Sequence, residues 1–263
     1  MWSYQHQHFT VHQLPVLRDN YIYLIEVHQS DTLIAIDPAE AVAVQHACKV
    51  LNKELTHIFN THHHWDHTDG NLTLKSVFNC LIVGAKNDAE RIPGIDLRVS
   101  ESETADISGI SLQVLDIPGH TSGHIAFVID DALFCGDTLF GAGCGRLFEG
   151  TPAQMWDSLC KLGKLKTDTK VYCAHEYTMA NLGFARTIDS NNESLLKRLQ
   201  HDERLREQEQ PTIPSCIATE LATNPFFRPL NSSFCLNYAT EHHLTNHDAL
   251  SIFTDLRLSR NQW

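Results

Sequence analysis

Five side chains that can bind a metal lie within seven residues, in the stretch Thr61-His62-His63-His64-Trp65-Asp66-His67. Neutral imidazoles and carboxylates are the usual ligands of zinc, iron and manganese. The preceding residues, Leu55 to Asn60, are rich in β-branched and aromatic side chains and predict a short strand. The stretch is therefore expected in the loop that leaves a strand, where a rigid scaffold presents it. The alternative is a histidine-rich surface tract, since 17 of the 263 residues are histidine.

The spacing within this stretch predicts two pairs of ligands. His62 and His64 alternate by two, so one extended segment can direct both imidazoles to the same side. Asp66 and His67 follow where the chain begins to turn. The two pairs would then face different points, which favours two metal ions over one.

Length and composition indicate a globular protein of one large domain or two modest ones. Hydrophobic residues make up 42% of the chain and charged residues 20%, which is ordinary for an enzyme. The net charge of −12 argues against a nucleic-acid partner, because phosphate binding needs a basic face. No run approaches the roughly 20 apolar residues of a membrane span. Eight cysteines without a CxxC pair predict reduced thiols and a cytoplasmic protein.

Short strands alternate with loops and a few helices up to about residue 174. The expected strands are Tyr21–Glu26, Leu33–Ile36, Cys80–Gly84, Ile110–Asp116, His124–Ile129, Ala132–Cys135 and Lys170–Ala174. Asp37 followed by Pro38 predicts the N-cap and first turn of a helix to about Leu51. Thr151 with Gln154 is typical of a capping box and predicts a helix to about Lys166. This pattern favours sheets packed on one another with helices outside.

The pattern becomes helical after His175. The expected helices are Thr178–Asp189, Asn192–Gln210 and Ala249–Ser259. Thr245 with Asp248 forms a second capping-box pattern before the last of them. The sequence therefore predicts a first domain over residues 1–174 and a smaller helical domain over residues 175–263.

Three later positions can complete the coordination of metals held by the first stretch. His120, Asp137 and His175 each follow a segment that resembles a strand. One edge of a sheet sandwich could gather them, although each alone is more often a cap or turn residue. Together with the 61–67 stretch they supply five histidines and two aspartates, which is enough for two metals.

These motifs resemble the metallo-β-lactamase superfamily and, within it, the glyoxalase II or hydroxyacylglutathione hydrolase family. The superfamily pattern is Thr-His-x-His-x-Asp-His at 61–67, followed in order by His120, Asp137 and His175. Segments similar to the narrower family are Pro118-Gly-His-Thr-Ser-Gly-His124, Gly136-Asp-Thr-Leu-Phe140, Gly143-Cys-Gly-Arg146, Glu149-Gly-Thr151, His175-Glu-Tyr-Thr178, Asn181-Leu182 and Asn224-Pro-Phe226. The resemblance runs from near residue 10 to the C-terminus.

The resemblance implies an α/β fold, a four-layer αββα sandwich followed by a small α-helical C-terminal domain that helps to hold glutathione. One divalent metal would be bound by His62, His64 and His120. The other would be bound by Asp66, His67 and His175, with Asp137 bridging the two. Zinc is the first candidate, and iron or manganese are alternatives because the same ligands suit all three. His63 and Trp65 fall at variable positions, where an exposed polar residue and a packing residue are expected.

The implied reaction is hydrolysis of S-D-lactoylglutathione and related S-(2-hydroxyacyl)glutathiones to glutathione and a 2-hydroxy acid such as D-lactate. This is the second step of glutathione-dependent methylglyoxal detoxification. The expected nucleophile is a metal-bridging hydroxide, formed from water whose pKa falls to around 7, with Asp66 and Asp137 as catalytic residues. A cytoplasmic monomer without nucleic-acid or membrane partners is expected.

Substrate binding needs a local basic group, because glutathione is anionic and the chain is acidic. Arg257 and Arg260 lie three residues apart, so a helix places them on one face. An ordinary solvated helix end is the alternative for these two. The resemblance places Arg146, Tyr177, Arg257 and Arg260 at glutathione contacts. Phe148 departs from the family pattern, since many members have tyrosine there and a hydroxyl contact would be missing.

Two other kinds of function remain open. Another enzyme of the superfamily, such as an iron-dependent persulfide dioxygenase or a lactonase, would share most of these ligands. The dioxygenase class uses one metal, so the number of metals per chain separates it from the first interpretation. A non-enzymatic metal store or sensor would instead have a shell filled entirely by protein.

Overall fold

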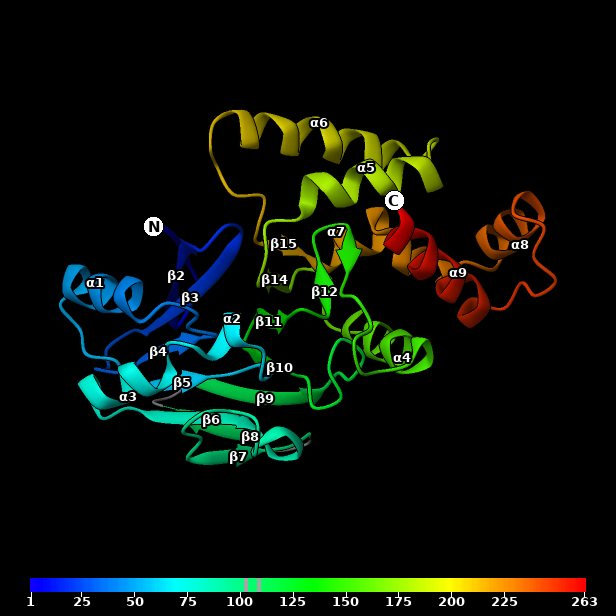
Figure 1. The fold of residues 1–263 in the computed structure, drawn as a ribbon. Coiled ribbons are helices and arrows are strands. Elements are labelled where there is room, and N and C mark those ends of the chain that lie inside the picture. Colours follow the sequence, from blue (N-terminus) through cyan, green and yellow to red (C-terminus); the bar gives the residue numbers. More distant parts are fainter. Residues whose placement is uncertain (102–103, 108–109) are drawn as a thin grey trace. The chain divides into compact units, whose positions relative to one another are not determined.

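The computed structural model describes residues 1–101, 104–107 and 110–263 (Figure 1). The chain divides into two compact units. Unit 1 comprises Met1–Asp116 and Gly123–Gly136, and unit 2 comprises Ile117–Ser122 and Asp137–Trp263. The sequence pattern predicts a domain boundary at 174/175. The division into compact units rests on a different criterion, so this boundary stays a prediction.

The first sheet of unit 1 has seven strands that neighbour one another in chain order. They are β1 (Trp2–Gln5), β2 (Phe9–Val16), β3 (Asn20–Val27), β4 (Leu33–Ile36), β5 (His57–Phe59), β6 (Leu81–Ala85) and β7 (Leu97–Val99). Strands β1 to β4 pair antiparallel, whereas β4 to β7 pair parallel. Because β4 and β5 are parallel neighbours, the loops that leave them emerge at the same edge of the sheet. Asp37 follows β4 and the 61–67 stretch follows β5, so both lie at this edge.

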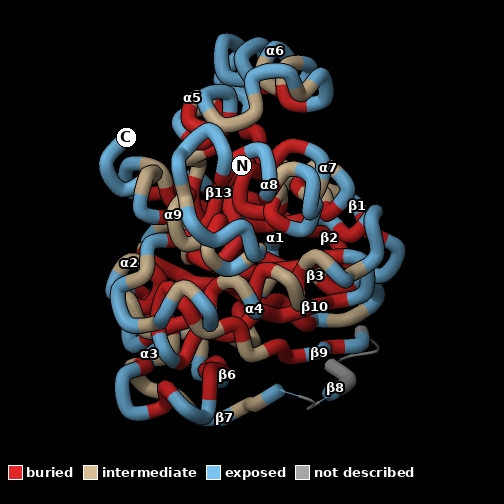
Figure 2. Tube along the Cα trace, turned by 90° about the vertical axis from the view of Figure 1, so that its right-hand side faces the viewer, coloured by how far each residue is buried: buried red, intermediate tan, exposed pale blue. Residues whose placement is uncertain are grey.

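A second sheet within unit 1 consists of antiparallel strands. They are β8 (Thr104–Ile107), β9 (Ile110–Asp116), β10 (Ile125–Ile129) and β11 (Ala132–Gly136). Every residue of β10 and β11 is buried (Figure 2). The two sheets meet through aromatic pairs, with ring centroids 5.7 Å apart for Tyr23 and Phe134 and 4.8 Å apart for Phe59 and Phe127. The sheets therefore share one core, as the sequence predicts.

Two helices of unit 1, α1 (Ala41–Leu51) and α3 (Asn71–Phe78), pack on the first sheet. Val44 of α1 and Leu74 of α3 are fully buried in one cluster with residues of the strands, among them Ile22, Leu33 and Ile58. A side chain of this size contributes about 1.5–3 kcal/mol when it leaves water, which explains why these helices stay on the sheet. The short elements α2 (Trp65–Thr68) and η1 (Lys86–Asp88) complete the helices described in unit 1.

The start of α1 differs from the prediction. The helix begins at Ala41 with Glu40 at its N-cap, and not at Pro38. Asp37 has φ +49°, and its carboxylate accepts hydrogen bonds from Thr61, 24 residues further along the chain. The predicted N-cap is therefore wrong, because this distant partner takes the carboxylate away from the helix amides.

Unit 2 is mainly helical. Its helices are α4 (Pro152–Leu162), α5 (Thr178–Ile188), α6 (Glu193–Glu207), α7 (Ile217–Thr223), η2 (Pro225–Leu230), α8 (Ser232–Glu241) and α9 (Ala249–Gln262). Its strands are β12 (Leu139–Phe140), β13 (Gly143–Cys144), β14 (Lys170–Cys173) and β15 (Ser215–Cys216). Helices α5 and α6 lie side by side (Figure 1). The ring of Phe226 in η2 packs against Phe184 of α5 and Phe253 of α9, so these elements share a core.

The helix caps of unit 2 confirm one capping-box prediction and correct the other. Thr151 Oγ1 accepts from the amide of Gln154, and the Gln154 side chain accepts from the amide of Thr151. The predicted capping box of α4 is therefore confirmed, although α4 ends at Leu162, before Gly163, and not at Lys166. Helix α9 is capped by Asp248, whose Oδ1 accepts from the amide of Ser251, and not by Thr245, because the Asp248 carboxylate already satisfies the first amides.

The eight cysteines are free thiols, and six of them are buried. Burial raises the pKa of the Cys48 thiol to about 11, so this thiol is protonated at neutral pH. Within the described residues, no helix combines the length and the apolar character needed to cross a bilayer.

Candidate metal centre

The 61–67 stretch lies in unit 1, in the loop that follows β5 and in the first three residues of α2. His62 and His67 are buried, and the chain turns into α2 at Trp65. This turn separates the extended pair, His62 and His64, from the helical pair, Asp66 and His67.

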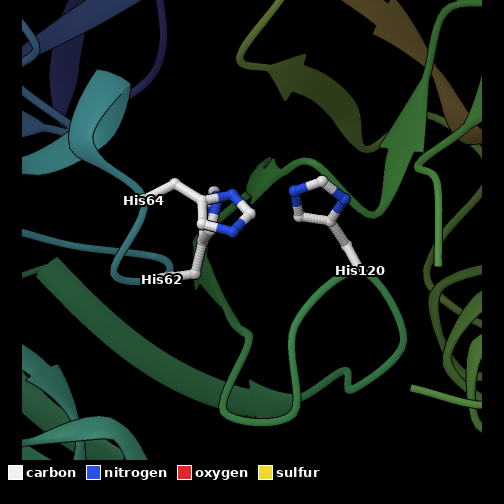
Figure 3. A group of neighbouring side chains, drawn as sticks. All are labelled: His62, His64 and His120. Atoms are coloured by element: carbon white, nitrogen blue, oxygen red, sulfur yellow. The ribbon is translucent and has the colours of Figure 1, made fainter. Parts of the chain in front are cut away.

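The first pair points its imidazoles toward one another (Figure 3). Nε2 of His62 is 3.1 Å from Nδ1 of His64. The ring of His124 stacks on His62, with centroids 4.5 Å apart and 16° between the planes. Nδ1 of His124 donates to the carbonyl of Ile125 at 3.0 Å, which fixes the stacked ring. His124 thus packs behind His62, and the nitrogens of His62 and His64 are close enough to share one cation.

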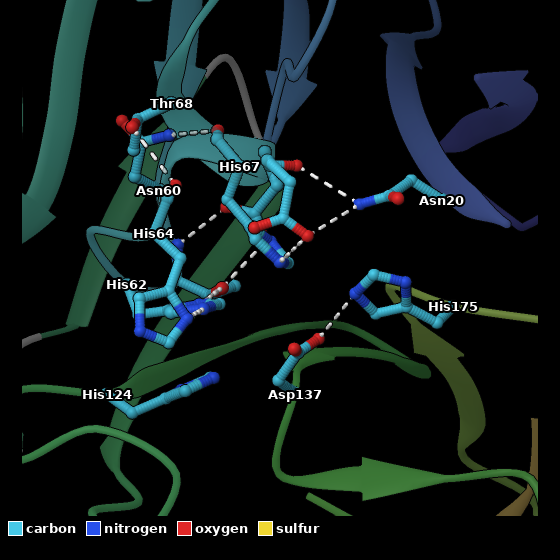
Figure 4. A network of polar contacts seen from close by, with 12 residues as sticks. Asn20, Asn60, His62, His64, His67, Thr68, His124, Asp137 and His175 are labelled. Carbon is cyan, nitrogen blue, oxygen red and sulfur yellow. Dashed lines mark hydrogen bonds and ion pairs between the residues drawn. The ribbon is translucent and has the colours of Figure 1, made fainter. Parts of the chain in front are cut away.

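The second pair is held by two asparagines (Figure 4). Nδ2 of Asn20 donates to Oδ2 of Asp66 at 3.1 Å and to the Asp66 carbonyl at 3.2 Å. Nδ2 of Asn60 donates to the carbonyl of His67 at 3.0 Å. Nε2 of His67 lies 3.7 Å from Oδ2 of Asp66, so the imidazole and the carboxylate present their donor atoms to the same region of unit 1.

Asp37 orients the same loop from the exit of β4. Its Oδ1 accepts from the amide of Thr61 at 2.8 Å, and its Oδ2 accepts from Thr61 Oγ1 at 2.6 Å and from His67 Nδ1 at 3.0 Å. Donor atoms of Asp37, His62 and His67 lie within 4.8 Å of one another, so the three could hold a metal themselves. The three hydrogen bonds occupy the Asp37 carboxylate, however, and we interpret it as the partner that orients His67 and not as a ligand.

Asp137 lies between two histidines of unit 2. Its Oδ2 is 3.4 Å from Nε2 of His120, and its Oδ1 is 3.3 Å from Nε2 of His175 (Figure 4). In the chain these residues follow β9, β11 and β14, so each comes at a strand exit. A carboxylate whose two oxygens face different imidazoles has the geometry of a ligand shared by two metals.

The donor chemistry fits divalent cations. Nδ1 of His120 donates to the carbonyl of Arg146 at 2.9 Å, and Nδ1 of His67 donates to Asp37. A histidine that donates through Nδ1 can bind a metal through Nε2, and the acceptor makes that nitrogen more basic. Imidazole nitrogen and carboxylate oxygen together suit zinc, iron and manganese.

The two variable positions of the stretch differ from the expectation. Trp65 does not pack, since 64% of its surface is exposed. It is the first residue of α2, whose buried positions are taken by His67 and Thr68. Nδ1 of His63 is 2.9 Å from Oδ2 of the buried Asp88, which ties the middle of the stretch to η1.

The residues predicted to bind the substrate all lie in unit 2: Arg146, Phe148, Tyr177, Arg257 and Arg260. Burial, and then the neighbouring Arg257 and Arg146, lower the pKa of Arg260, so the three cations are close together. Arg257 is buried, with Nη1 donating to the Cys144 carbonyl at 2.8 Å and Nη2 donating to Asn261 at 3.0 Å. Arg146 is exposed. These three arginines place positive charge close together, which an anionic ligand requires.

Two aromatic residues of this predicted set contact histidines of unit 2. Tyr177 stacks on His175, with centroids 4.7 Å apart and 4° between the planes. The ring of Phe148 lies 5.1 Å from that of His120, yet 64% of Phe148 is exposed. An exposed aromatic beside a proposed ligand is available to a bound molecule, although it offers no hydroxyl.

Sequence reasoning missed Asp37 and Asn20, which orient proposed ligands, and Asp88, which contacts His63. Asp37 carries the same signal as Asp137, an aspartate directly after a buried strand, so the signal was present. Asn20 and Asp88 contact residues 46 and 25 positions away, and no local pattern indicates them.

Two protein-family models match the chain. The model of the metallo-β-lactamase superfamily matches residues 16–175. The model described as hydroxyacylglutathione hydrolase C-terminus matches residues 176–263. The two models together account for all but the first 15 residues.

Similar proteins carry the corresponding names. A hydroxyacylglutathione hydrolase from Methylococcus capsulatus is 52% identical over 219 residues, which cover 82% of this chain and 86% of that protein. Another from Rhodospirillum rubrum is 45% identical and covers 96% of this chain and 98% of that protein. Among solved structures, the BLEG-1 B3 metallo-β-lactamase has a TM-score of 0.63 at 18% identity, covering 82% of this chain and 99% of that one. This structure shows the likeness in fold.

Proposed function

Since the chain belongs to the hydroxyacylglutathione hydrolase family of the metallo-β-lactamase superfamily, we propose that it hydrolyses S-(2-hydroxyacyl)glutathiones, with S-D-lactoylglutathione as substrate. The products are glutathione and a 2-hydroxy acid, here D-lactate. The fold is the αββα metallo-β-lactamase sandwich with a helical C-terminal region, and the chain is a thioester hydrolase. A dioxygenase, a lactonase or a metal store is not favoured, because relatives along most of the chain are named as this hydrolase.

The proposed centre holds two divalent cations, with zinc as the first candidate. The residues proposed to bind one cation are His62, His64 and His120, and those proposed to bind the other are Asp66, His67 and His175. Asp137 belongs to both sets. The observation that carries this proposal is the placement of Asp137, whose two oxygens face His120 and His175 separately. A carboxylate with this placement can bind two metals at once.

Residues of the protein orient the groups that react, namely the attacking water and the thioester. When bound, a pair of divalent cations polarises the thioester carbonyl and lowers the pKa of water to around 7. Asp66, held by Asn20, can accept a hydrogen bond from the attacking water and so direct its lone pair. The leaving group is a thiol with an ordinary pKa of about 8.5, so its thiolate departs without a strong general acid.

The substrate contacts proposed are Arg146, Phe148, Tyr177, Arg257 and Arg260. The three arginines supply positive charge to the glycyl and glutamyl carboxylates of glutathione. Tyr177 and Phe148 lie beside His175 and His120, so they can contact the part of the substrate nearest the thioester. The loss of a hydroxyl at Phe148 lowers affinity for glutathione but leaves the chemistry intact.

We also propose a cytoplasmic monomer, with residues 1–174 as catalytic domain and 175–263 as glutathione-binding domain. Eight free thiols support a reducing compartment. The net charge of −12 supports a small-molecule substrate over nucleic acid. The monomeric state stays a prediction that sedimentation would test.

The decisive experiment is release of free thiol from S-D-lactoylglutathione by the purified protein, before and after chelation. We expect release that chelation abolishes and that added zinc restores. Asp137→Ala should lose both turnover and metal content, whereas Asp168→Ala, at an exposed position, should keep both. A protein without chelator-sensitive thiol release, or Asp137→Ala with near-normal turnover, would overturn the proposal.

Metal analysis of the same sample separates the alternatives. Two metals per chain are expected for the hydrolase. One iron per chain, together with dioxygen consumption on glutathione persulfide, would identify the dioxygenase instead.

A further inference from the structure

A short hairpin of unit 2, formed by β12 and β13, lies in the chain between Asp137 and Arg146. Its backbone carbonyls accept hydrogen bonds from side chains of the helices. Nδ2 of Asn224 donates to the carbonyl of Gly143 at 2.9 Å, and Nδ2 of Asn181 donates to the carbonyl of Gly141 at 3.0 Å. The helical part of unit 2 therefore determines where this hairpin lies.

Glu220 is the acidic residue of this arrangement and is fully buried. Its Oε2 accepts from the amide of Ala142 at 2.9 Å and from Nδ2 of Asn224 at 3.1 Å. Its Oε1 accepts from Nη2 of Arg198 at 2.8 Å and from Ser215 Oγ at 2.6 Å. Ala142 has φ +52°, a conformation that costs an L-residue free energy, so the hairpin tip depends on contacts such as this one.

Arg198 fixes the orientation of the Glu220 carboxylate. Its Nη1 donates to Thr223 Oγ1 at 2.7 Å, and its Nε donates to Asp202 at 3.2 Å. Burial opposes its charge, but the carboxylates of Glu220 and Asp202 raise the pKa of Arg198 above its ordinary value, so it stays a cation. A buried ion pair is weak evidence for stability, because desolvation offsets its attraction. The ion pair instead holds one acceptor oxygen, Oε2 of Glu220, opposite the amide of Ala142.

We propose that Glu220, oriented by Arg198, is a positioning residue for substrate binding. By holding the tip of the hairpin it sets the place of Arg146, the proposed glutathione contact two residues after β13. The amide of Gly145 donates to the carbonyl of Thr138 at 3.2 Å, so the base of the hairpin is closed and a shift of the tip is passed on to Arg146. This inference rests on the proposed hydrolase function.

The first test is Glu220→Gln. Arg198 and Ser215 both donate to Oε1, so they retain the one remaining side-chain oxygen. The NH2 group of the substituted side chain then takes the place of Oε2, and it faces the amide N–H of Ala142 as a second donor. An unfavourable buried contact of this kind corresponds to about a tenfold effect. We expect KM for S-D-lactoylglutathione to rise about tenfold while kcat stays within about twofold, and amide exchange at Ala142 to accelerate.

The second test is the double variant Arg198→Met with Glu220→Gln. Without the guanidinium, the carboxamide that replaces the Glu220 carboxylate is free to rotate, and its oxygen can accept the amide of Ala142 again. Asp202 loses the same guanidinium in this variant, so circular dichroism must first show that the double variant folds. We expect KM to return to within about twofold of the wild-type value, a rescue that general loosening of the fold would not produce.

The matched control is Tyr238→Phe, which removes a partly buried hydrogen bond to Asp255, away from the hairpin in the chain. Its KM should equal the wild-type value. An unchanged KM in Glu220→Gln, or a folded double variant with a raised KM, would overturn the positioning role. If Glu220→Gln does not fold, the KM of the double variant decides alone. If the wild-type protein releases no thiol, the proposed function itself is refuted. Failure of the function can therefore be told apart from failure of the positioning role.

Discussion

At the scale of single residues, the carboxylate of Asp37 accepts hydrogen bonds from Thr61 and from Nδ1 of His67. Asn at this position would have to direct its NH2 group at one of these donors. We therefore expect Asp37→Asn to weaken metal binding about 10- to 100-fold, the usual cost of losing a partner that orients a ligand. Competition with a chelator of known affinity measures this. Asp31→Asn, at an exposed position, should bind as the wild type does, and equal affinity in both variants would contradict the role of Asp37.

Arg257 and Arg146 differ in burial although both are proposed to bind glutathione. Arg257 is buried and donates to the carbonyl of Cys144, whereas Arg146 is exposed. We expect Arg257→Ala to raise KM far more than it lowers kcat and also to lower Tm, because a buried carbonyl loses its donor. Arg146→Ala should raise KM without changing Tm. Steady-state kinetics and thermal unfolding of the two variants check this, and a pure kcat defect in Arg257→Ala would count against its assignment.

At the scale of elements, Asp96 links α3 to β6. Nζ of Lys75 in α3 donates to Asp96, and the amide of Ile82 donates to the same carboxylate at 2.9 Å. These two donors, Lys75 first, hold the pKa of Asp96 below its ordinary value. Because its pKa is lower in the folded state, the Asp96 carboxylate stabilises the fold when the pH is above the ordinary pKa near 3.9. This stabilisation is lost as the pH falls through the pKa of the folded state.

Asp96→Asn should therefore cost stability at pH 7 but little at pH 2.5. The carboxylate is largely exposed, so the expected loss at pH 7 is about 0.5–1 kcal/mol. Denaturant titrations of the wild type and the variant at both pH values measure it. A loss of the same size at pH 2.5 would show that the charge of Asp96 is not the cause.

Elements stabilised by neighbouring residues could be predicted from the sequence, and those that depend on distant contacts could not. The capping box of Thr151 and Gln154 spans three residues, and α4 starts where it predicts. Strand β4 coincides with its predicted bounds, since its apolar run is continuous. The start of α1 was wrong because Asp37 binds Thr61 across two parallel strands. The candidates within the 61–67 stretch could be proposed because their spacing is local. Glu220 could not, since its partner Ala142 is 78 residues away.

At the scale of the whole molecule, the proposed ligands are divided between the two compact units. His62, His64, Asp66 and His67 belong to unit 1, and His120, Asp137 and His175 belong to unit 2. A metal that binds only the folded chain stabilises the fold, whichever residues supply its ligands. The same division explains why no single segment of the sequence contains the proposed centre.

Removal of the metal should therefore lower the stability of the entire chain. A ligand that binds only the folded state stabilises it by about 4 kcal/mol at a thousandfold excess over its Kd. For a chain of this size that corresponds to a fall in Tm of roughly 10 °C after chelation, measured by calorimetry with and without added zinc. Asp137→Ala should lose most of this difference, because both proposed metals share the Asp137 carboxylate, whereas Asp168→Ala should retain it. Equal Tm values for chelated and zinc-loaded wild-type protein would mean that no metal stabilises the folded chain.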